Sequence, residues 1–199
     1  MKKAFLFLFL FSLILFAASA MFFKETFLHV IALHLAIFSI SLYFLFEKDF
    51  ETTFKKLGIT GINLKEILLY TVKGTIGVIF LTIILSLALN YLHLNDREKV
   101  VEVANMLPPY ILIFAIVFAP ITEELFFRAF LVERFGVSVS SIIFALSHIA
   151  YGSISEILAA FFIGYIFALI YKSSKSVLPT IFIHFLFNLG SIVLMRTFG

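Results

Sequence analysis

Three ionisable side chains lie within the apolar stretch "FAPITEELFFRAF", residues 118–130. Glu123 and Glu124 are adjacent carboxylates, and Arg128 follows four residues after Glu124. An ionised side chain away from water costs about 2.5–3.5 kcal/mol on insertion scales unless it is paired or used. Glu124 and Arg128 have i,i+4 spacing and would face each other on a helix, where they can form a charge-assisted pair. Glu123 points about 100° away from that pair and is left for another role.

Polar side chains also occur in two later apolar stretches. His148 closes "FALSH", and His184 and Asn188 stand four residues apart in "HFLFN". Counted at about 1.5 Å per residue from the inner ends of their helices, Glu123, His148 and His184 lie at nearly the same depth, about 14–16 Å in. Asn188 lies one turn deeper. We therefore expect a polar catalytic cavity in the C-terminal half of the chain, lined by these side chains.

Pro120 precedes Glu123 by three residues. It cannot donate a hydrogen bond to the carbonyl of Ile116, so we expect the helix to kink there. Irregular backbone at membrane depth is tolerated where it lines a protein-enclosed or water-filled cavity. Such a cavity is also what ionisable side chains at this depth require.

A carboxylate with two imidazoles and an amide suits the activation of a water molecule. Glu123 would be the general base, and one histidine would orient the water or carry a proton. The other histidine, with Asn188, would donate hydrogen bonds to an oxyanion. Glu123, His148 and His184 could instead hold a zinc ion with water as its fourth ligand. The residues leave both schemes open.

Other intramembrane hydrolases fit less well. The chain has no H-E-x-x-H pair, which a zinc-protease helix needs, and no G-x-G-D stretch of the aspartyl type. Ser147 and His148 are neighbours in sequence, and neighbouring helical residues point in different directions, so a rhomboid-type serine protease is not favoured. Because the chain contains no cysteine, it has no thiol nucleophile, disulfide or thiolate metal site.

Three short motifs, E-E-x-x-x-R, F-x-x-x-H and H-x-x-x-N, follow one another in apolar segments. Each is weak alone, and together they resemble the CPBP family, the CAAX prenyl proteases and bacteriocin-processing enzymes also called Abi. The resemblance covers about residues 105–190. It implies an intramembrane endopeptidase, a family usually labelled metalloprotease, for which a metal-free, glutamate-activated water is a competing scheme. It implies four catalytic residues and two supporting ones: Glu123, His148, His184 and Asn188, with Glu124 and Arg128 in support.

The composition is that of a polytopic helical membrane protein. Of 199 residues, 62% are hydrophobic and 14% are charged, and the mean hydropathy is +1.13. Soluble domains run at about 45–50% apolar and about 25% charged. The net charge of +3 comes from lysines in loops rather than from an arginine-rich stripe, so it indicates topology and not a nucleic-acid partner.

A membrane-spanning helix needs about 20 apolar residues. Seven stretches approach this length, although the fifth is short and is expected to be tilted or partly re-entrant. The expected spans are 4–23, 27–46, 67–92, 108–132, 138–151, 155–171 and 177–196. Between the second and third spans, the charged stretch 47–66 is expected to be an amphipathic segment at the membrane surface.

Lysines and arginines gather in the loops that are inside if the N-terminus is inside, as the positive-inside rule requires. We therefore expect an integral protein of the cell membrane, with its catalytic cavity open to the cytoplasm. The first span also resembles a signal peptide, because "ASA" at 18–20 has an A-x-A pattern. Its length and the spans that follow favour an uncleaved helix. The chain would be one membrane domain, with N-terminal helices at 1–104 and a catalytic core at 105–199.

The expected substrates are peptide bonds at or near the lipid bilayer, of CAAX type or related, including those of lipidated proteins. Nothing in the sequence specifies prenyl recognition. The rival interpretation is a non-catalytic immunity or scaffold protein that keeps the polar cluster for folding or binding. A proton-coupled transporter fits less well, since its polar residues would spread along a path. His29, His34 and His93 lack polar neighbours at matching depth and are expected to be structural.

Overall fold

The computed structural model describes residues 1–18 and 26–198, whose regular secondary structure is entirely helical, with no strand. The predicted all-α class is therefore confirmed. The second half of the "ASA" motif lies outside the described residues. The elements are α1 (Lys2–Ala18), α2 (Thr26–Leu45), α3 (Phe50–Lys56), α4 (Leu64–Tyr91), α5 (Glu98–Met106), α6 (Pro109–Glu123), the π-helix η2 (Glu124–Val132), α7 (Glu133–Ser147), the 3₁₀ turn η3 (Ile149–Tyr151), α8 (Ile154–Ser174) and α9 (Leu178–Phe198).

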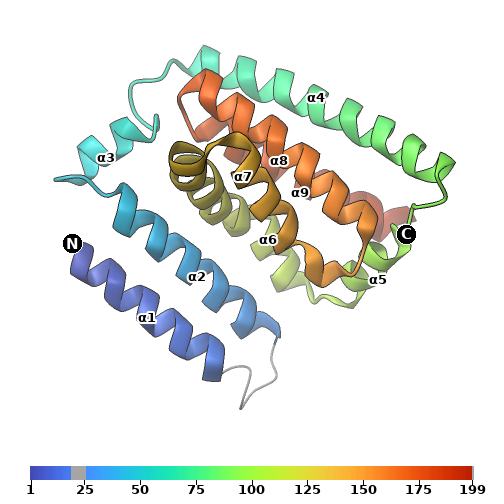
Figure 1. The fold of residues 1–199 in the computed structure, drawn as a ribbon, viewed down its shortest axis with the longest axis horizontal. Helices are drawn as coiled ribbons and strands as arrows, with labels where there is room; N and C mark the ends of the chain where they lie inside the picture. The colour runs from blue at the N-terminus through green and yellow to red at the C-terminus, as the bar shows by residue number, and fades with distance from the viewer. Residues whose placement is uncertain (19–25, 199) are drawn as a thin grey trace.

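The C-terminal helices form the centre of the molecule and the earlier helices flank it (Figure 1). On one side α2 packs on α6 and η2, with α1 outside it. On the opposite side α4 packs on α8 and α9. The main apolar core gathers around η2, α7 and α8. The polar motifs therefore lie in the best-enclosed part of the fold.

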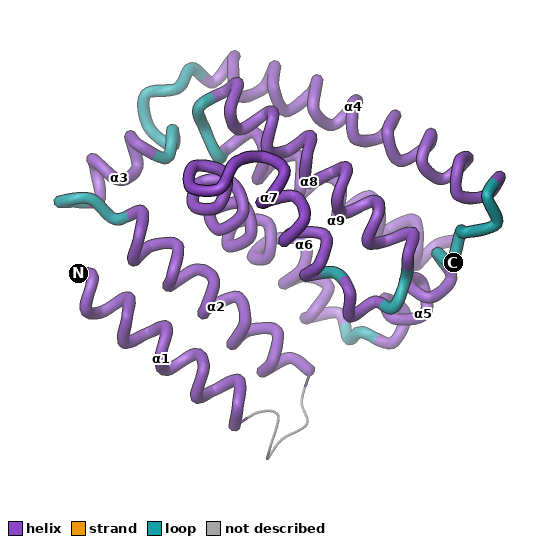
Figure 2. The backbone as a smooth tube through the Cα atoms, in the orientation of Figure 1, coloured by secondary structure: helices purple, strands orange, loops and turns teal. Residues whose placement is uncertain are grey.

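Five helical stretches are long and apolar enough to cross a membrane among the described residues, which supports an integral membrane protein. The predicted count of seven is not confirmed. The described part of the first span, α1, has 17 residues. The fourth and fifth predicted spans form one stretch, Pro109–Tyr151, and Figure 2 draws it as helix as far as the end of α7.

The chain nevertheless turns within that stretch, at Gly136. Its φ of 83° and ψ of 174° are non-helical and separate α7 from the preceding segment. Glycine suits this conformation because a side chain would be strained at positive φ. After the turn α7 packs back on η2, and the Ser140 hydroxyl donates to the Phe127 carbonyl at 2.6 Å. The part of α7 after Gly136 is about 16 Å long at 1.5 Å per residue, too short to cross a bilayer alone.

The helix α6 contains Pro120 without ending there, so the kink expected at this residue stays a prediction. The α-helix gives way four residues later, where η2 begins at Glu124. Eight of the nine η2 residues are buried, so packing on all sides holds this rare conformation in place. A π-helix inside an α-helix frequently marks a functional site. Here it begins between the two adjacent glutamates.

The start of α9 is tied to the loop after α3. The Ser176 hydroxyl donates to the Gly58 carbonyl at 2.6 Å, and the Val177 N–H donates to the Leu57 carbonyl at 3.2 Å. Gly58 has a φ of +64°, and a Cβ there would lie 2.2 Å from the carbonyl oxygen of Lys175. Only glycine fits so close an approach. These contacts fix the end of the helix that carries His184.

Candidate active site

Glu124 and Arg128 form the predicted ion pair in the centre of the bundle. The Nε–Oε2 distance is 2.8 Å, and neither side chain is exposed. The rings of Phe144, Phe167 and Phe127 surround the guanidinium, with centroids 4.7, 5.5 and 5.9 Å from its carbon. Aromatic faces stabilise a desolvated cation. The local spacing therefore predicted this pair correctly, and the pair makes the buried charges tolerable.

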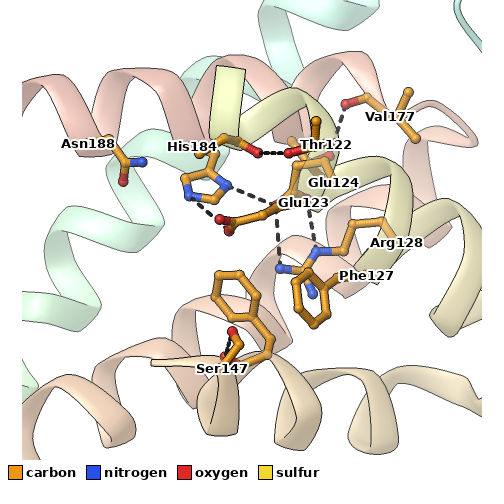
Figure 3. Close-up of polar contacts among 12 residues, drawn as sticks. Thr122, Glu123, Glu124, Phe127, Arg128, Ser147, Val177, His184 and Asn188 are labelled. Carbon is orange, nitrogen blue, oxygen red and sulfur yellow. Dashed lines mark hydrogen bonds and ion pairs between the residues drawn. The ribbon is translucent and has the colours of Figure 1, made fainter. Parts of the chain in front are cut away.

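His184 of α9 reaches both glutamates (Figure 3). Its Nδ1 lies 3.0 Å from Oε1 of Glu124, and its Nε2 lies 3.9 Å from Oε2 of Glu123. A carboxylate accepts hydrogen bonds, so Nδ1 is the nitrogen that donates to Glu124. A carboxylate partner of this kind fixes the orientation and tautomer of an imidazole. Nε2 is consequently the atom that His184 presents to Glu123.

Glu123 has no such partner for its own carboxylate. Its side chain is 17% exposed, yet Oε2 is buried without a hydrogen bond. The nearest nitrogens are Nε2 of His34 at 3.8 Å and Nε2 of His184 at 3.9 Å, both beyond hydrogen-bond distance. The Glu123 carboxylate can therefore still accept hydrogen bonds, whereas the Glu124 carboxylate already accepts them from Arg128 and His184.

His34 was expected to lack polar neighbours, and this expectation is wrong. Its Nδ1 lies 2.6 Å from the Thr122 hydroxyl, and its ring packs edge-on against Phe114 at 5.0 Å. The residue lies in α2, and only the packing of α2 on α6 brings it to Glu123. No motif in the sequence signals that contact. A polar residue in an apolar span was the sole indication.

His29 and His93 are not part of this cluster. The ring of His29 packs against Phe16 at 5.4 Å. His93 follows the end of α4 with a φ of 56°. Neither contradicts its predicted structural role.

His148 and Asn188 lie beside His184, around a pocket of about 60 Å³ between α7, α8 and α9. His148 Nδ1 is 2.8 Å from the Phe144 carbonyl oxygen, which can only accept, so this nitrogen donates and Nε2 remains free to act. Asn188 donates one amide hydrogen to the Ala115 carbonyl at 2.9 Å and keeps a second.

Glu156, in the first turn of α8, also lines this pocket, and the sequence did not single it out. The ring of Tyr151 stacks on His148 with centroids 6.2 Å apart. A larger pocket of about 360 Å³ between α4 and the end of α8 holds none of the motif residues. We place the candidate site at the smaller pocket and at Glu123, because the chemically competent side chains lie there.

A metal centre is not assembled from the expected ligands. Among the residues that the structure describes, no group of three or more His, Cys, Asp or Glu side chains is arranged to hold a metal ion. Of the zinc set named from the sequence, Nε2 of His184 and Oε2 of Glu123 lie 3.9 Å apart, and His148 is not grouped with them in such an arrangement.

Comparison with known proteins finds a family model that matches part of the chain. No curated protein and no solved structure matches the chain. Residues 105–190 match the family model described as "Type II CAAX prenyl endopeptidase Rce1-like". The matched segment contains all three motifs and agrees with the CAAX-protease resemblance read from them. Residues 105–190, less than half of the chain, are thus similar to the Rce1-like family of CAAX endopeptidases.

Proposed function

We propose that the chain is an intramembrane endopeptidase that hydrolyses peptide bonds with a water molecule activated by Glu123. The observation that carries this proposal is the contrast between adjacent glutamates in an Rce1-like segment. Glu124 is satisfied by Arg128 and His184, whereas Oε2 of Glu123 is buried without a hydrogen bond. A general base needs an acceptor that nothing else occupies.

Glu124 and Arg128 serve as support in this scheme. Arg128 keeps Glu124 paired, and Glu124 holds Nδ1 of His184. A buried carboxylate of this kind orients an imidazole and stabilises the imidazolium when it forms. His184 then presents Nε2 toward Glu123 and toward a bound peptide. It is suited to stabilise negative charge or to pass a proton to the leaving amine.

His148 and Asn188 line the pocket next to His184, where the scissile carbonyl would lie. The second amide hydrogen of Asn188 can donate to a developing oxyanion. His148, with Nδ1 fixed by the Phe144 carbonyl, offers Nε2 to a water or a substrate group. Both side chains are held by backbone carbonyls, so they are oriented before substrate binds.

The reaction balances with these groups. The Glu123 carboxylate takes a proton from water, and the hydroxide oxygen bonds to the scissile carbonyl carbon. The resulting oxyanion accepts hydrogen bonds from Asn188 and from the imidazolium form of His184 or His148. Collapse breaks the carbon–nitrogen bond, and the proton on Glu123 passes to the leaving amine. The products are a carboxylic acid and an amine.

The substrate class follows from the family and the environment. CAAX-type or related peptides at the membrane are the leading substrates, because the matched family model describes CAAX endopeptidases. We place the protein in the cell membrane with the site open to the cytoplasm, as the distribution of lysine and arginine favours. The division into N-terminal helices at 1–104 and a catalytic core at 105–199 is part of the same proposal.

The test is cleavage of CAAX-type peptides, prenylated and not, by purified protein in lipid nanodiscs. Glu123→Gln should lower kcat by about 10²–10⁴-fold, the usual contribution of a general base. Glu102→Gln makes the same change at an exposed carboxylate of α5 and should leave kcat unchanged. Full cleavage by Glu123→Gln would overturn the proposal.

Metal analysis of the same preparations separates the two water-activating schemes. Wild-type protein that cleaves without bound metal supports the glutamate scheme. Stoichiometric zinc that is lost in His148→Ala would instead support a metal-assisted reaction. Cleavage of no peptide by a folded wild-type protein would favour the non-catalytic scaffold.

A further inference from the structure

We infer that His34 of α2 is a positioning residue for Glu123, so the site extends beyond the family segment into the N-terminal half. The inference rests on the proposed function, because it assigns His34 a role through the general base. Residues 105–190 supply the three motifs. His34 lies outside that segment, in a helix with no motif of its own.

The contacts of His34 fix its ring on both sides. Nδ1 lies 2.6 Å from the hydroxyl of Thr122, the residue before Glu123. Nε2 lies 3.8 Å from Oε1 of Glu123, and Phe114 packs edge-on against the ring. Oε1 of Glu123 therefore faces an imidazole from α2, while Oε2 faces His184 from α9. The carboxylate is held between two imidazoles from opposite ends of the chain.

Thr122 determines which nitrogen of His34 carries the proton. Its hydroxyl has one hydrogen, and the backbone carbonyl of Ala119 lies 3.1 Å away on the same helix. A threonine hydroxyl on a helix commonly donates backward to such a carbonyl. Its oxygen then accepts from Nδ1–H of His34, because a hydroxyl has one donor and two acceptor sites. Neutral His34 consequently presents the lone pair of Nε2 to Glu123.

Nε2 of neutral His34 can accept a hydrogen bond from Glu123 after Glu123 has become protonated. Once Glu123 has taken the proton of the attacking water, its O–H would donate to Nε2 of His34 when the present 3.8 Å separation tightens to hydrogen-bond distance in the substrate complex. The acid then keeps its orientation until the proton moves to the leaving amine. Without His34, protonated Glu123 would lose this acceptor at Oε1. The effect is on the reaction step rather than on substrate binding.

The test compares His34→Gln with His29→Gln, which makes the same change five residues away on the same helix. His34→Gln should lower kcat about 10- to 100-fold with little change in KM, and it should shift the pH dependence of kcat. The ionisable groups that face His34 are Glu123 from α6 and His184 from α9. His29→Gln should leave kcat, KM and the pH profile unchanged.

Two conservative variants of Thr122 test the contact between its hydroxyl and His34. Thr122→Val removes the hydroxyl at nearly constant volume and should reproduce part of the loss, whereas Thr122→Ser should restore activity. A purely structural His34 would lower thermal stability without moving the pH profile. Wild-type kcat and pH profile in His34→Gln, with an active wild-type enzyme, would overturn the inference.

A readout that does not depend on cleavage separates this inference from the proposed function. In protein with ¹⁵N-labelled histidine, Glu123→Gln should change the Nε2 resonance of His34, and Thr122→Val should change Nδ1. The His29 resonances should stay constant. These shifts in a wild-type protein that cleaves nothing would refute the peptidase but retain the His34 contacts. Unchanged His34 resonances would refute the contacts themselves.

Discussion

Asp96 and Glu123 are equally exposed carboxylates in opposite hydrogen-bonding environments, since each side chain is 17% accessible. Asp96 lies in the loop between α4 and α5 and contacts the start of α8, where it accepts from the Ser153 hydroxyl at 2.7 Å and from the N–H groups of Ile154 and Ser155, each at 3.0 Å. Glu123 has a buried oxygen with no hydrogen bond.

The difference distinguishes a structural carboxylate, Asp96, from the candidate general base, Glu123. Asp96 has donors for both oxygens, including the ammonium of Lys99 at 3.1 Å, so it ties the loop before α5 to α8. Glu123 is left unsatisfied in the middle of a well-packed bundle. An unsatisfied buried acceptor costs about 1–3 kcal/mol and calls for an explanation. Under the proposed function, the explanation is the proton that Glu123 takes from water.

The largest expected effect is on stability and concerns Glu124, a third carboxylate. Replacing Arg128 leaves Glu124 buried without its ion-pair partner. Arg128→Met should lower the free energy of unfolding by about 3–5 kcal/mol, because it leaves a buried charge without its partner. Denaturant unfolding in detergent micelles measures this. Arg134→Met is the matched control, since Arg134 is exposed and rests on Phe44 and Phe130. Equal losses in both variants would contradict a special role for the buried pair.

Asp96→Asn should have the next largest effect, on stability alone. The asparagine amide keeps one acceptor oxygen but loses the negative charge, which accepts three hydrogen bonds from the start of α8 and pairs with Lys99. We expect Tm to fall by about 2–4 °C, the size of a lost helix cap in a chain of this length. Peptide cleavage at a temperature well below Tm should be unchanged. A loss of kcat without a loss of Tm would break the comparison.

Glu123→Gln should show the reverse pattern. Replacing an unsatisfied carboxylate by a neutral amide removes a desolvated charge, so Tm should stay constant or rise by about 1–3 °C while cleavage is lost. A stability–activity trade-off of this kind is common at catalytic sites. Thermal unfolding of the variant beside wild type measures it. A fall in Tm as large as that of Asp96→Asn would mean that Glu123 is structural.

The smallest effect concerns pH. Hydrogen bonds from Ser153, Ser155 and Ile154 hold the pKa of Asp96 well below its usual value of 3.8. Asp96 therefore stabilises the fold fully above that value, and the contribution is lost as pH falls through it toward the folded pKa. The stability difference between wild type and Asp96→Asn should be constant from pH 7 to 5 and should shrink below pH 4. A difference that grows on acidification would contradict the assigned cause.

Local spacing made part of the site predictable from sequence. The i,i+4 rule was sufficient for Glu124 and Arg128, because both partners lie on one helical segment. Counting depth along helices correctly brought Glu123 to His184, since both positions follow from helix rise alone. Depth does not tell which helices are neighbours. His34 was missed for that reason, as its contact with Glu123 depends on the packing of α2 against α6.

The fold was predictable in class but not in its irregularities. Apolar length predicted the long helices, and Pro109 begins α6 as expected for a proline in the first turn. The π-helix at Glu124–Val132 was not predicted, because it arises where a segment is buried on nearly every side. The span count of seven relied on length alone and is not confirmed, whereas the fifth span was expected to be short, and α7 is short after the turn at Gly136.

The candidate site draws on both ends of the chain, from His34 in α2 to Asn188 in α9, and this has a consequence for biosynthesis. Membrane helices are inserted as the chain leaves the ribosome, with the N-terminal ones first. A nascent chain that ends before α9 has both partners of the Glu124–Arg128 pair, but it lacks His184, whose imidazole is oriented by Glu124. The entry of α9 into the bilayer therefore completes the cluster. Under the proposed function, a growing chain would remain inert toward neighbouring nascent peptides until α9 had been made.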